Sequence, residues 1–291
     1  MAFFDKLDSI MREDPGRRGL IPSLPANPVA ELNEALDGTK RVILLTGFPI
    51  RLADDKFIGE TDGPLGTANI AASLEKMGVD ILPLTDDEGF KPFAAALKTV
   101  GCKTAPVLIP AINTDEFIRQ QLDEFNPTHV ITLERPGKAR DGHYHNMRGN
   151  IIDDMLADTT IIIEEAKKRG ITTISVGDGG NEIGMGALRE AIEANVPHGE
   201  VICASECAQV SVVSGVSNWW GWGISALLSL KHGKNLLPDK ELELDMIKAV
   251  VAAGSVDGCT KENVITVDNL SMEVHLDILN KVRAALAEEL G

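Results

Sequence analysis

The sequence predicts an α/β fold, built on a doubly wound and mostly parallel sheet with helices on both faces. Short β-branched runs alternate with helical patterns along most of the chain, which is typical of this class. The runs at residues 42–45 and 171–176 are apolar or β-branched without strict alternation, as expected for strands covered on both faces. Unusual loop segments follow four of the predicted strands, where open α/β sheets bind their ligands.

Each predicted element rests on periodicity and on the residues that bound it. Glycine follows Met77 and Arg169, where two helices are expected to end. The link 206–209 is short enough for a hairpin, which would add an antiparallel pair and make the sheet mixed. The predicted strands are residues 41–46, 79–84, 106–109, 129–133, 171–176, 201–205 and 210–213, and the predicted helices are residues 29–36, 65–77, 115–125, 153–169, 187–195, 224–231, 242–253 and 272–290.

The 291 residues are expected to form a single α/β domain in which residues 1–40 are an N-terminal arm. Residues 11–28 contain four prolines and two glycines with no sustained period, as expected for an arm that wraps the domain or a neighbouring subunit. A homo-oligomer is therefore one expectation. No apolar run approaches the roughly 20 residues that span a bilayer, and the first residues lack a signal-peptide core. With four scattered cysteines, these features predict a cytoplasmic protein.

The composition excludes several classes of partner. The 44 acidic and 28 basic residues give a net charge of −16, which repels phosphate backbones and argues against nucleic acid. No phosphate-binding loop and no dinucleotide fingerprint are present, so no nucleotide cofactor is expected. The expected partner is a small molecule, and no membrane association is predicted.

The segment from Gly177 to Gly186 is the first candidate for an active site. It holds five glycines, Asp178, Glu182 and Asn181 within ten residues, between a predicted strand and a predicted helix. Glycine at this density has an entropic cost, which is tolerated where main-chain amides must approach something closely. The flanking acids indicate that the loop handles a metal ion, an ammonium group or a proton. The alternative is a tight structural turn.

Three further loops carry unusual side chains, and each has a structural alternative. Residues 60–64 contain Glu60 and Asp62 and could simply cap a helix. Residues 134–149 concentrate basic groups and histidines, or form an ordinary surface loop. Residues 214–223 hold Ser217, Asn218 and all three tryptophans, which form either a pocket wall or core packing.

At these segments the sequence resembles the D-glutamate cyclase family, in particular the module that forms the C-terminal half of its mitochondrial member. Coverage runs from about residue 41 to the C-terminus, and no counterpart of that member's hydro-lyase-like N-terminal module is present. Trp220 departs from the expected pattern, which has glycine after Ser217-Asn218-Trp219. The resemblance is carried by Glu60-Thr61-Asp62-Gly63-Pro64, Glu134-Arg135-Pro136-Gly137, Asp141-Gly142, Asn146-Met147-Arg148-Gly149, Gly177 to Gly186, Ser217-Asn218-Trp219, Val256-Asp257-Gly258 and Glu273-Val274-His275-Leu276.

The resemblance implies a lyase that closes D-glutamate into 5-oxo-D-proline with loss of water. The α-amine must lose its proton, and the γ-carboxyl group must be protonated or polarised by a metal. Asp178 or Glu182 would accept the ammonium proton or bind a divalent ion, Mn²⁺ or Mg²⁺.

The remaining roles follow from the same hypothesis. Arg135 and Arg148 would clamp the α-carboxylate. The amides of Gly179 and Gly180, with Asn181, would stabilise developing negative charge. The other predicted catalytic residues are His143, His145 and Asp141, and the other predicted substrate-binding residues are Glu60, Asp62, Asn146, Ser217 and Asn218.

Two other functions fit the same loops. One is a different lyase or hydrolase that acts on a small amino acid or carboxylic acid. The other is a non-catalytic module that binds an amino acid. The density of acids, histidines and arginines in the loops favours catalysis.

Overall fold

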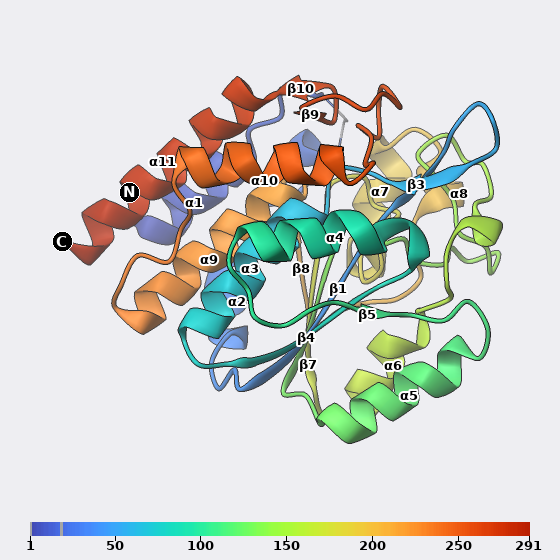
Figure 1. Ribbon diagram of the computed structural model, residues 1–291, viewed down its shortest axis with the longest axis horizontal. Helices are drawn as coiled ribbons and strands as arrows, with labels where there is room; N and C mark the ends of the chain where they lie inside the picture. The colour runs from blue at the N-terminus through green and yellow to red at the C-terminus, as the bar shows by residue number, and fades with distance from the viewer. Residues whose placement is uncertain (1, 18–19) are drawn as a thin grey trace.

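The computed structural model describes residues 2–17 and 20–291, and it confirms the α/β fold. Within these residues, six parallel strands form one sheet in the spatial order β5-β4-β1-β6-β7-β8 (Figure 1). The six strands are β1 (Arg41–Thr46), β4 (Asp80–Thr85), β5 (Val107–Leu108), β6 (His129–Leu133), β7 (Thr172–Gly177) and β8 (Val210–Val213).

The strand order places a crevice between β1 and β6. The chain leaves β1 toward β4 on one side, whereas it leaves β6 toward β7 on the other. Loops that diverge in this way open a crevice at the carboxyl ends of the two strands, which is where ligands bind in doubly wound sheets. The order of the six strands is also that of dinucleotide-binding sheets.

Two hydrophobic layers cover the two faces of the sheet. On one face, Val42, Leu44 and Ile131 belong to a large cluster with residues of α1, α2, α3, α4, α9, α10 and α11. On the other face, Ile43 and Val130 pack against α5 and α6, and Figure 1 shows these two helices on the opposite side from α3 and α9. The sheet is therefore covered on both faces, as the uniform apolar character of its strands predicts.

None of the helices in the described residues is long and apolar enough to cross a membrane. Two short pairs of antiparallel strands lie outside the main sheet in the described part of the chain. The helices are α1 (Phe3–Met11), α2 (Val29–Ala35), α3 (Pro64–Lys76), α4 (Asp87–Thr99), α5 (Thr114–Phe125), α6 (Ile161–Lys168), α7 (Arg189–Asn195), α8 (Gly199–Ile202), α9 (Asn218–His232), α10 (Lys240–Ala252) and α11 (Met272–Leu290), with short 3₁₀ turns at Ile21–Ser23, Asp153–Met155 and Gly186–Leu188; the short strands are β2 (Pro49–Arg51), β3 (Phe57–Gly59), β9 (Thr266–Val267) and β10 (Leu270–Ser271).

The structure corrects one predicted strand and decides between a parallel and a mixed sheet. Residues 201–205 do not form a strand, because the segment enters the single turn α8, which buries Ile202 against Ile192 and Val196. Strand β8 pairs with β7 in parallel, so the main sheet is parallel throughout and residues 206–209 do not form a hairpin turn. The helix predicted over residues 153–169 begins at Ile161, whereas α9 begins six residues earlier than predicted, at Asn218.

The N-terminal region is more ordered than the predicted arm. Residues 3–11 form α1, whose side chains Phe3, Leu7 and Ile10 enter the main hydrophobic cluster beside α11. Helix α1 lies beside the C-terminal helix α11 (Figure 1). Between them, Lys6 Nζ donates a 2.7 Å bond to Glu288. Residues 1, 18 and 19, which belong to the predicted arm, lie outside the described residues.

Helices α3 and α9 cross at a pair of glycines, and this crossing positions the candidate site. A Cβ atom on Gly221 would lie 2.4 Å from the Cα of Gly66, and one on Gly66 would lie 2.8 Å from the Cα of Asn218. Only glycine permits backbones to approach this closely. The contact brings the first turn of α9 against the first turn of α3 and the loop before it.

Candidate active site

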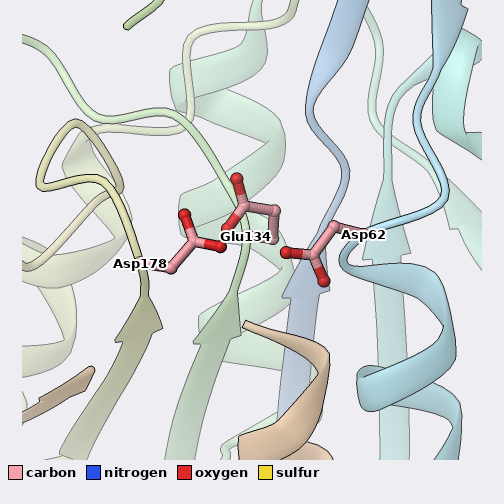
Figure 2. A group of neighbouring side chains, drawn as sticks. All are labelled: Asp62, Glu134 and Asp178. Atoms are coloured by element: carbon pink, nitrogen blue, oxygen red, sulfur yellow. The ribbon is translucent and has the colours of Figure 1, made fainter. Parts of the chain in front are cut away.

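Three buried carboxylates meet at the carboxyl end of the sheet. Asp62 precedes α3, Glu134 directly follows β6, and Asp178 directly follows β7. One oxygen from each lies within 4.8 Å of the others, and Figure 2 shows the three side chains side by side above the ends of the strands. All three residues are buried, with Glu134 at 5% exposure. An oxygen-rich group of this kind can hold a metal ion.

Local backbone geometry directs these side chains toward one another. Leu133 pairs with Thr46 of β1 and with Val176 of β7, so the residues that follow these strands share one edge. Glu134 adopts a left-handed conformation with φ of 48°, an uncommon state for a residue other than glycine. On the other side, Gly63 has φ of 101°, and a Cβ there would lie 2.7 Å from Thr46 Oγ1. These two turns aim Glu134 and Asp62 at the same point.

The first turn of α9 faces the three carboxylates. The Ser217 amide donates to Asp62 at 3.1 Å and to Asp178 at 3.2 Å, while the Asn218 amide donates to Asp62 at 2.9 Å. The Ser217 hydroxyl donates a 2.6 Å bond to Glu134. Because the N-terminus of a helix carries partial positive charge, these contacts offset part of the repulsion among the acids.

The electrostatics of the group single out Glu134. Burial raises the pKa of this carboxyl group well above its usual range, and the neighbouring Asp178, Glu182, Asp62 and Glu60 raise it further. A carboxyl group in this setting is stabilised either by a proton or by a cation. The site is therefore poised to bind positive charge.

A cavity of about 500 Å³ opens over the carboxylates. Its polar floor includes Glu60, Glu134 and Asp178, while Asp62 lies behind them. Its apolar wall comes from β2 and from the loop after β6, and a volume of this size is typical of small-molecule sites. The lining residues are Phe48, Pro49, Ile50, Arg51, Glu60, Glu134, Asn146, Met147, Arg148, Asn150, Ile151, Ile152, Met155, Asp178, Asn181, Pro197, Gly258, Cys259, Lys261 and Asp268.

The glycine loop is built around Glu182, which does not line the cavity. The carboxylate of Glu182 accepts the backbone amides of Asp178 at 2.9 Å, Gly179 at 2.7 Å and Gly180 at 2.7 Å. The amides of Gly179 and Gly180 are therefore bonded within the loop, whereas the sequence predicted that they stabilise charge on the substrate. Asp178 is the acid of this loop that reaches the cavity.

Arg135, which the sequence predicted as a substrate clamp, is not among the residues that line the cavity. Its side chain is fully buried and forms a 2.6 Å ion pair with Asp86, and it donates to the carbonyl of Ala157 at 2.6 Å. The contacts join the loop after β6 to the start of α4. Arg135 therefore stabilises the walls of the site.

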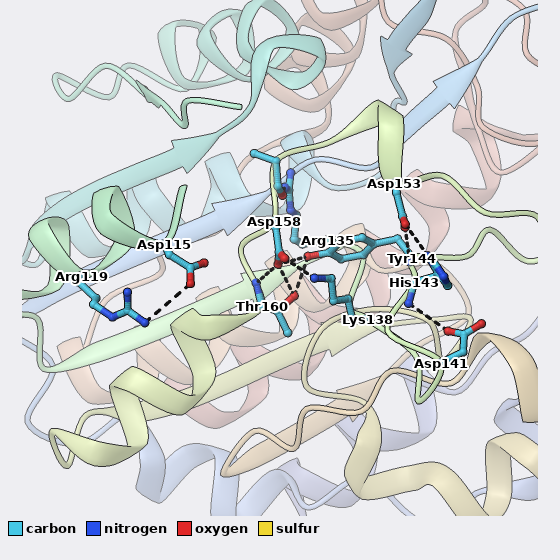
Figure 3. A network of polar contacts seen from close by, with 11 residues as sticks. Asp115, Arg119, Arg135, Lys138, Asp141, His143, Tyr144, Asp153, Asp158 and Thr160 are labelled. Atoms are coloured by element: carbon cyan, nitrogen blue, oxygen red, sulfur yellow. Dashed lines mark hydrogen bonds and ion pairs between the residues drawn. The ribbon is translucent and has the colours of Figure 1, made fainter. Parts of the chain in front are cut away.

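The predicted catalytic histidines hold the loop after β6 together. His143 is exposed and pairs with Asp153 at 2.6 Å, as Figure 3 shows. His145 is buried between Asp141, at 2.9 Å, and the carbonyl of Gly149, at 3.1 Å. These three predicted catalytic residues, Asp141, His143 and His145, are not among the residues that line the cavity, and their side-chain hydrogen bonds lie within the loop after β6.

Other predicted residues do meet at the cavity. Glu60, Asn146, Arg148 and Asn181 line it. Asn181 also donates to the carbonyl of His145 at 2.8 Å, which ties the glycine loop to the loop after β6. Ser217 and Asn218 lie behind the floor and support the carboxylates.

The three tryptophans that follow belong to the core, since each is at most 2% exposed. The indole of Trp219 donates to His275 at 2.9 Å and that of Trp222 to Glu243 at 2.8 Å. The tryptophans thus pack α9 in place rather than line the pocket.

Sequence reasoning did not assign a role to Glu134, nor to Arg51, Lys261 or Asp268 in the cavity wall. The signal for Glu134 was its place directly after a buried strand, the same place that Asp178 has after β7. The others lie in loops whose approach to the sheet depends on tertiary packing.

Two comparisons with known proteins give matches over most of the chain. A family model described as "D-glutamate cyclase-like, C-terminal" matches residues 7–283. A human protein named "D-glutamate cyclase, mitochondrial" is 32% identical over 239 residues. That match covers 78% of this chain and 39% of the human protein, so the chain spans less than half the length of this relative.

Proposed function

Since the chain belongs to the D-glutamate cyclase-like C-terminal family, we propose that it is a carbon–oxygen lyase that converts D-glutamate into 5-oxo-D-proline and water. The human relative carries the name of this activity, and this chain corresponds to 39% of its length. The proposal for this chain therefore depends on the chemistry of its own residues. The observation that carries it is the group of three buried carboxylates at the floor of an open cavity.

The reaction requires protons to move but consumes none. The α-ammonium group of D-glutamate loses two protons, its nitrogen forms a bond to the γ-carboxyl carbon, and one carbon–oxygen bond breaks. The departing oxygen takes up two protons and leaves as water. No oxidant, reductant or nucleotide is needed, so the enzyme has to fold the substrate, accept protons from nitrogen and deliver them to oxygen.

The carboxylates suit these tasks. Asp178 lines the cavity, and its carboxylate is held by the amide of Ser217, which fixes its orientation. An ammonium group at the floor would face this acid, so Asp178 is the proposed acceptor of its proton. Glu134, whose pKa burial raises, is the proposed carboxyl group beside the departing oxygen.

The residues also fit a divalent cation. Magnesium and manganese prefer oxygen ligands, and the site offers three buried carboxylates with unbalanced negative charge. Asp62, Glu134 and Asp178 would hold such an ion. When bound, it would polarise the γ-carboxyl group of the substrate.

The test is a proton NMR time course of the protein with D-glutamate and, separately, with L-glutamate. Each reaction is run with Mn²⁺, with Mg²⁺ and with a chelator. The proposal expects 5-oxoproline from the D-isomer, and loss of product in the chelator sample would assign activation of the γ-carboxyl group to a metal. If no sample forms the lactam but D-glutamate binds, the chain is an amino-acid-binding module and the proposal fails.

A further inference from the structure

The cavity lining carries both negative and positive side chains. Four acids, Glu60, Glu134, Asp178 and Asp268, and three cations, Arg51, Arg148 and Lys261, are among the residues that line it. In a chain of net charge −16, basic side chains gathered at one site call for an explanation.

Two of the three cations have no acidic partner among the residues that the structure describes. Arg51 bonds both carboxylate oxygens of Asp154 at 2.7 Å and stacks on Phe57 at 4.7 Å from the ring centre. In contrast, Arg148 and Lys261 form no ion pair with any of residues 2–17 and 20–291. The side chain of Lys261 donates to the neutral carbonyl oxygen of Arg51 at 2.9 Å. The positive charge of Lys261 is therefore available to a ligand.

The backbone around Lys261 is fixed by Asp257. This buried carboxylate accepts four donors: the amides of Cys259, Thr260 and Asn269 and the hydroxyl of Thr266, at 2.6–3.0 Å. The Lys261 amide then closes the turn by donating to the Asp257 carbonyl at 2.7 Å. Lys261 itself has φ of 62°, so its loop leaves this turn in a defined direction. A lysine on a rigid turn loses less entropy when it binds a ligand than one on a mobile loop.

We propose that Lys261, together with Arg148, binds the α-carboxylate of the substrate and so sets the orientation of the substrate in the cavity. This inference rests on the proposed function, because that reaction requires the amine and the γ-carboxyl group at the floor of acids. The α-carboxylate of the substrate is repelled by Glu60 and Asp178 and is attracted to the unpaired cations Arg148 and Lys261. Lys261 has the role of carboxylate clamp that the sequence predicted for Arg135.

The test compares two ligands with and without the recognised carboxylate, in binding experiments that need no turnover. The ligands are 5-oxo-D-proline and pyrrolidin-2-one, which is the same lactam without its carboxylate. Calorimetric titration of the intact chain should show that the wild-type protein prefers 5-oxo-D-proline. Lys261→Met should reduce this preference by about tenfold or more, as expected for loss of a hydrogen bond between charged groups.

Two further variants serve as controls. Lys261→Arg restores a positive charge and should restore the preference. Lys56→Met removes a lysine that pairs with Asp54 in the β2–β3 turn and does not line the cavity, so the preference should stay unchanged. A general effect on folding would alter the affinity for both ligands alike and would leave their ratio intact.

The inference is overturned if the ratio in Lys261→Met equals that of the wild type, or if neither ligand binds the wild type. Failure of the proposed function has a different signature. In that case the wild type forms no 5-oxoproline from D-glutamate, while the preference for the carboxylate ligand and its dependence on Lys261 persist.

Discussion

Replacement of Glu243 by glutamine is expected to stabilise the protein, and more so at high pH. Glu243 lies on α10 with 1% exposure, and it accepts the indole of Trp222 at 2.8 Å and the amide of Asn69 at 2.5 Å. Burial raises the pKa of this carboxyl group from 4.5 to about 7, although the two hydrogen bonds partly oppose the rise. The folded state therefore holds a proton that the unfolded chain has already lost.

The sign and size of the pH effect on stability follow from the difference in the pKa of Glu243 between the folded and unfolded states. Between pH 4.5 and about 7, the native state binds more protons than the unfolded state, so the free energy of unfolding falls as the pH rises. At about 1.4 kcal/mol per pH unit, the full loss is about 3 kcal/mol. Glu243→Gln removes the titration, so its advantage over the wild type should be about 1 kcal/mol at pH 5.5 and about 3 kcal/mol at pH 8.

Urea unfolding at the two pH values measures this difference. Glu241→Gln is the matched control, since Glu241 is an exposed acid on the same helix and its replacement should give a difference that does not grow with pH. An advantage of Glu243→Gln that stays constant from pH 5.5 to pH 8, or a loss of stability at pH 8, would refute the reasoning. Such a result would mean that hydrogen bonds in the core stabilise the ionised form of Glu243 as well as water does.

Three other predictions concern the site. Glu182→Ala should lower the free energy of unfolding by at least about 3 kcal/mol in urea titrations, because three buried amides lose their acceptor. Arg135→Met should lower the free energy of unfolding by about 3–5 kcal/mol, because it leaves Asp86 buried without its ion pair. Arg148→Met should leave the free energy of unfolding unchanged and weaken the binding of 5-oxo-D-proline. Equal stability of the two variants would contradict these roles. Mn²⁺ should raise the melting temperature of the wild type more than that of Asp62→Asn, and the same increase in both would exclude Asp62 as a ligand.

Much of the fold could be predicted because the strands carry their own signal. All six strands of the main sheet lie within one residue of their predicted positions at both ends, since β-branched and apolar runs bounded by turn residues are local features. Helix α4 was missed because Gly89 and Pro92 interrupt its pattern, yet Pro92 is buried inside the helix. Helix α1 was missed because the proline-rich residues that follow it indicated an irregular arm. In both helices, packing against the core outweighs local preference.

The site could be predicted in position but not in the role of each side chain. Asp178, which lines the cavity, was predicted as a site residue because it directly follows a strand in a glycine-rich loop. Glu134 and Arg135 are adjacent in the sequence, but the left-handed backbone at Glu134 lets one side chain face the cavity while the other reaches Asp86. The partner of Arg135 lies 49 residues away in the chain, and such a pairing leaves no local signal.

The central claim is that the buried carboxylates Asp62, Glu134 and Asp178 carry out the reaction. Asp141 and the histidines of the loop after β6 do not take part in it. The most direct test is the rate of 5-oxoproline formation from D-glutamate, followed by NMR, in Asp178→Asn and in Asp141→Asn. Both replacements remove one charge, but Asp178 lines the cavity whereas Asp141 bonds His145 outside it. The account predicts that Asp178→Asn abolishes turnover in a folded protein and that Asp141→Asn retains it. Full activity in Asp178→Asn would contradict the account.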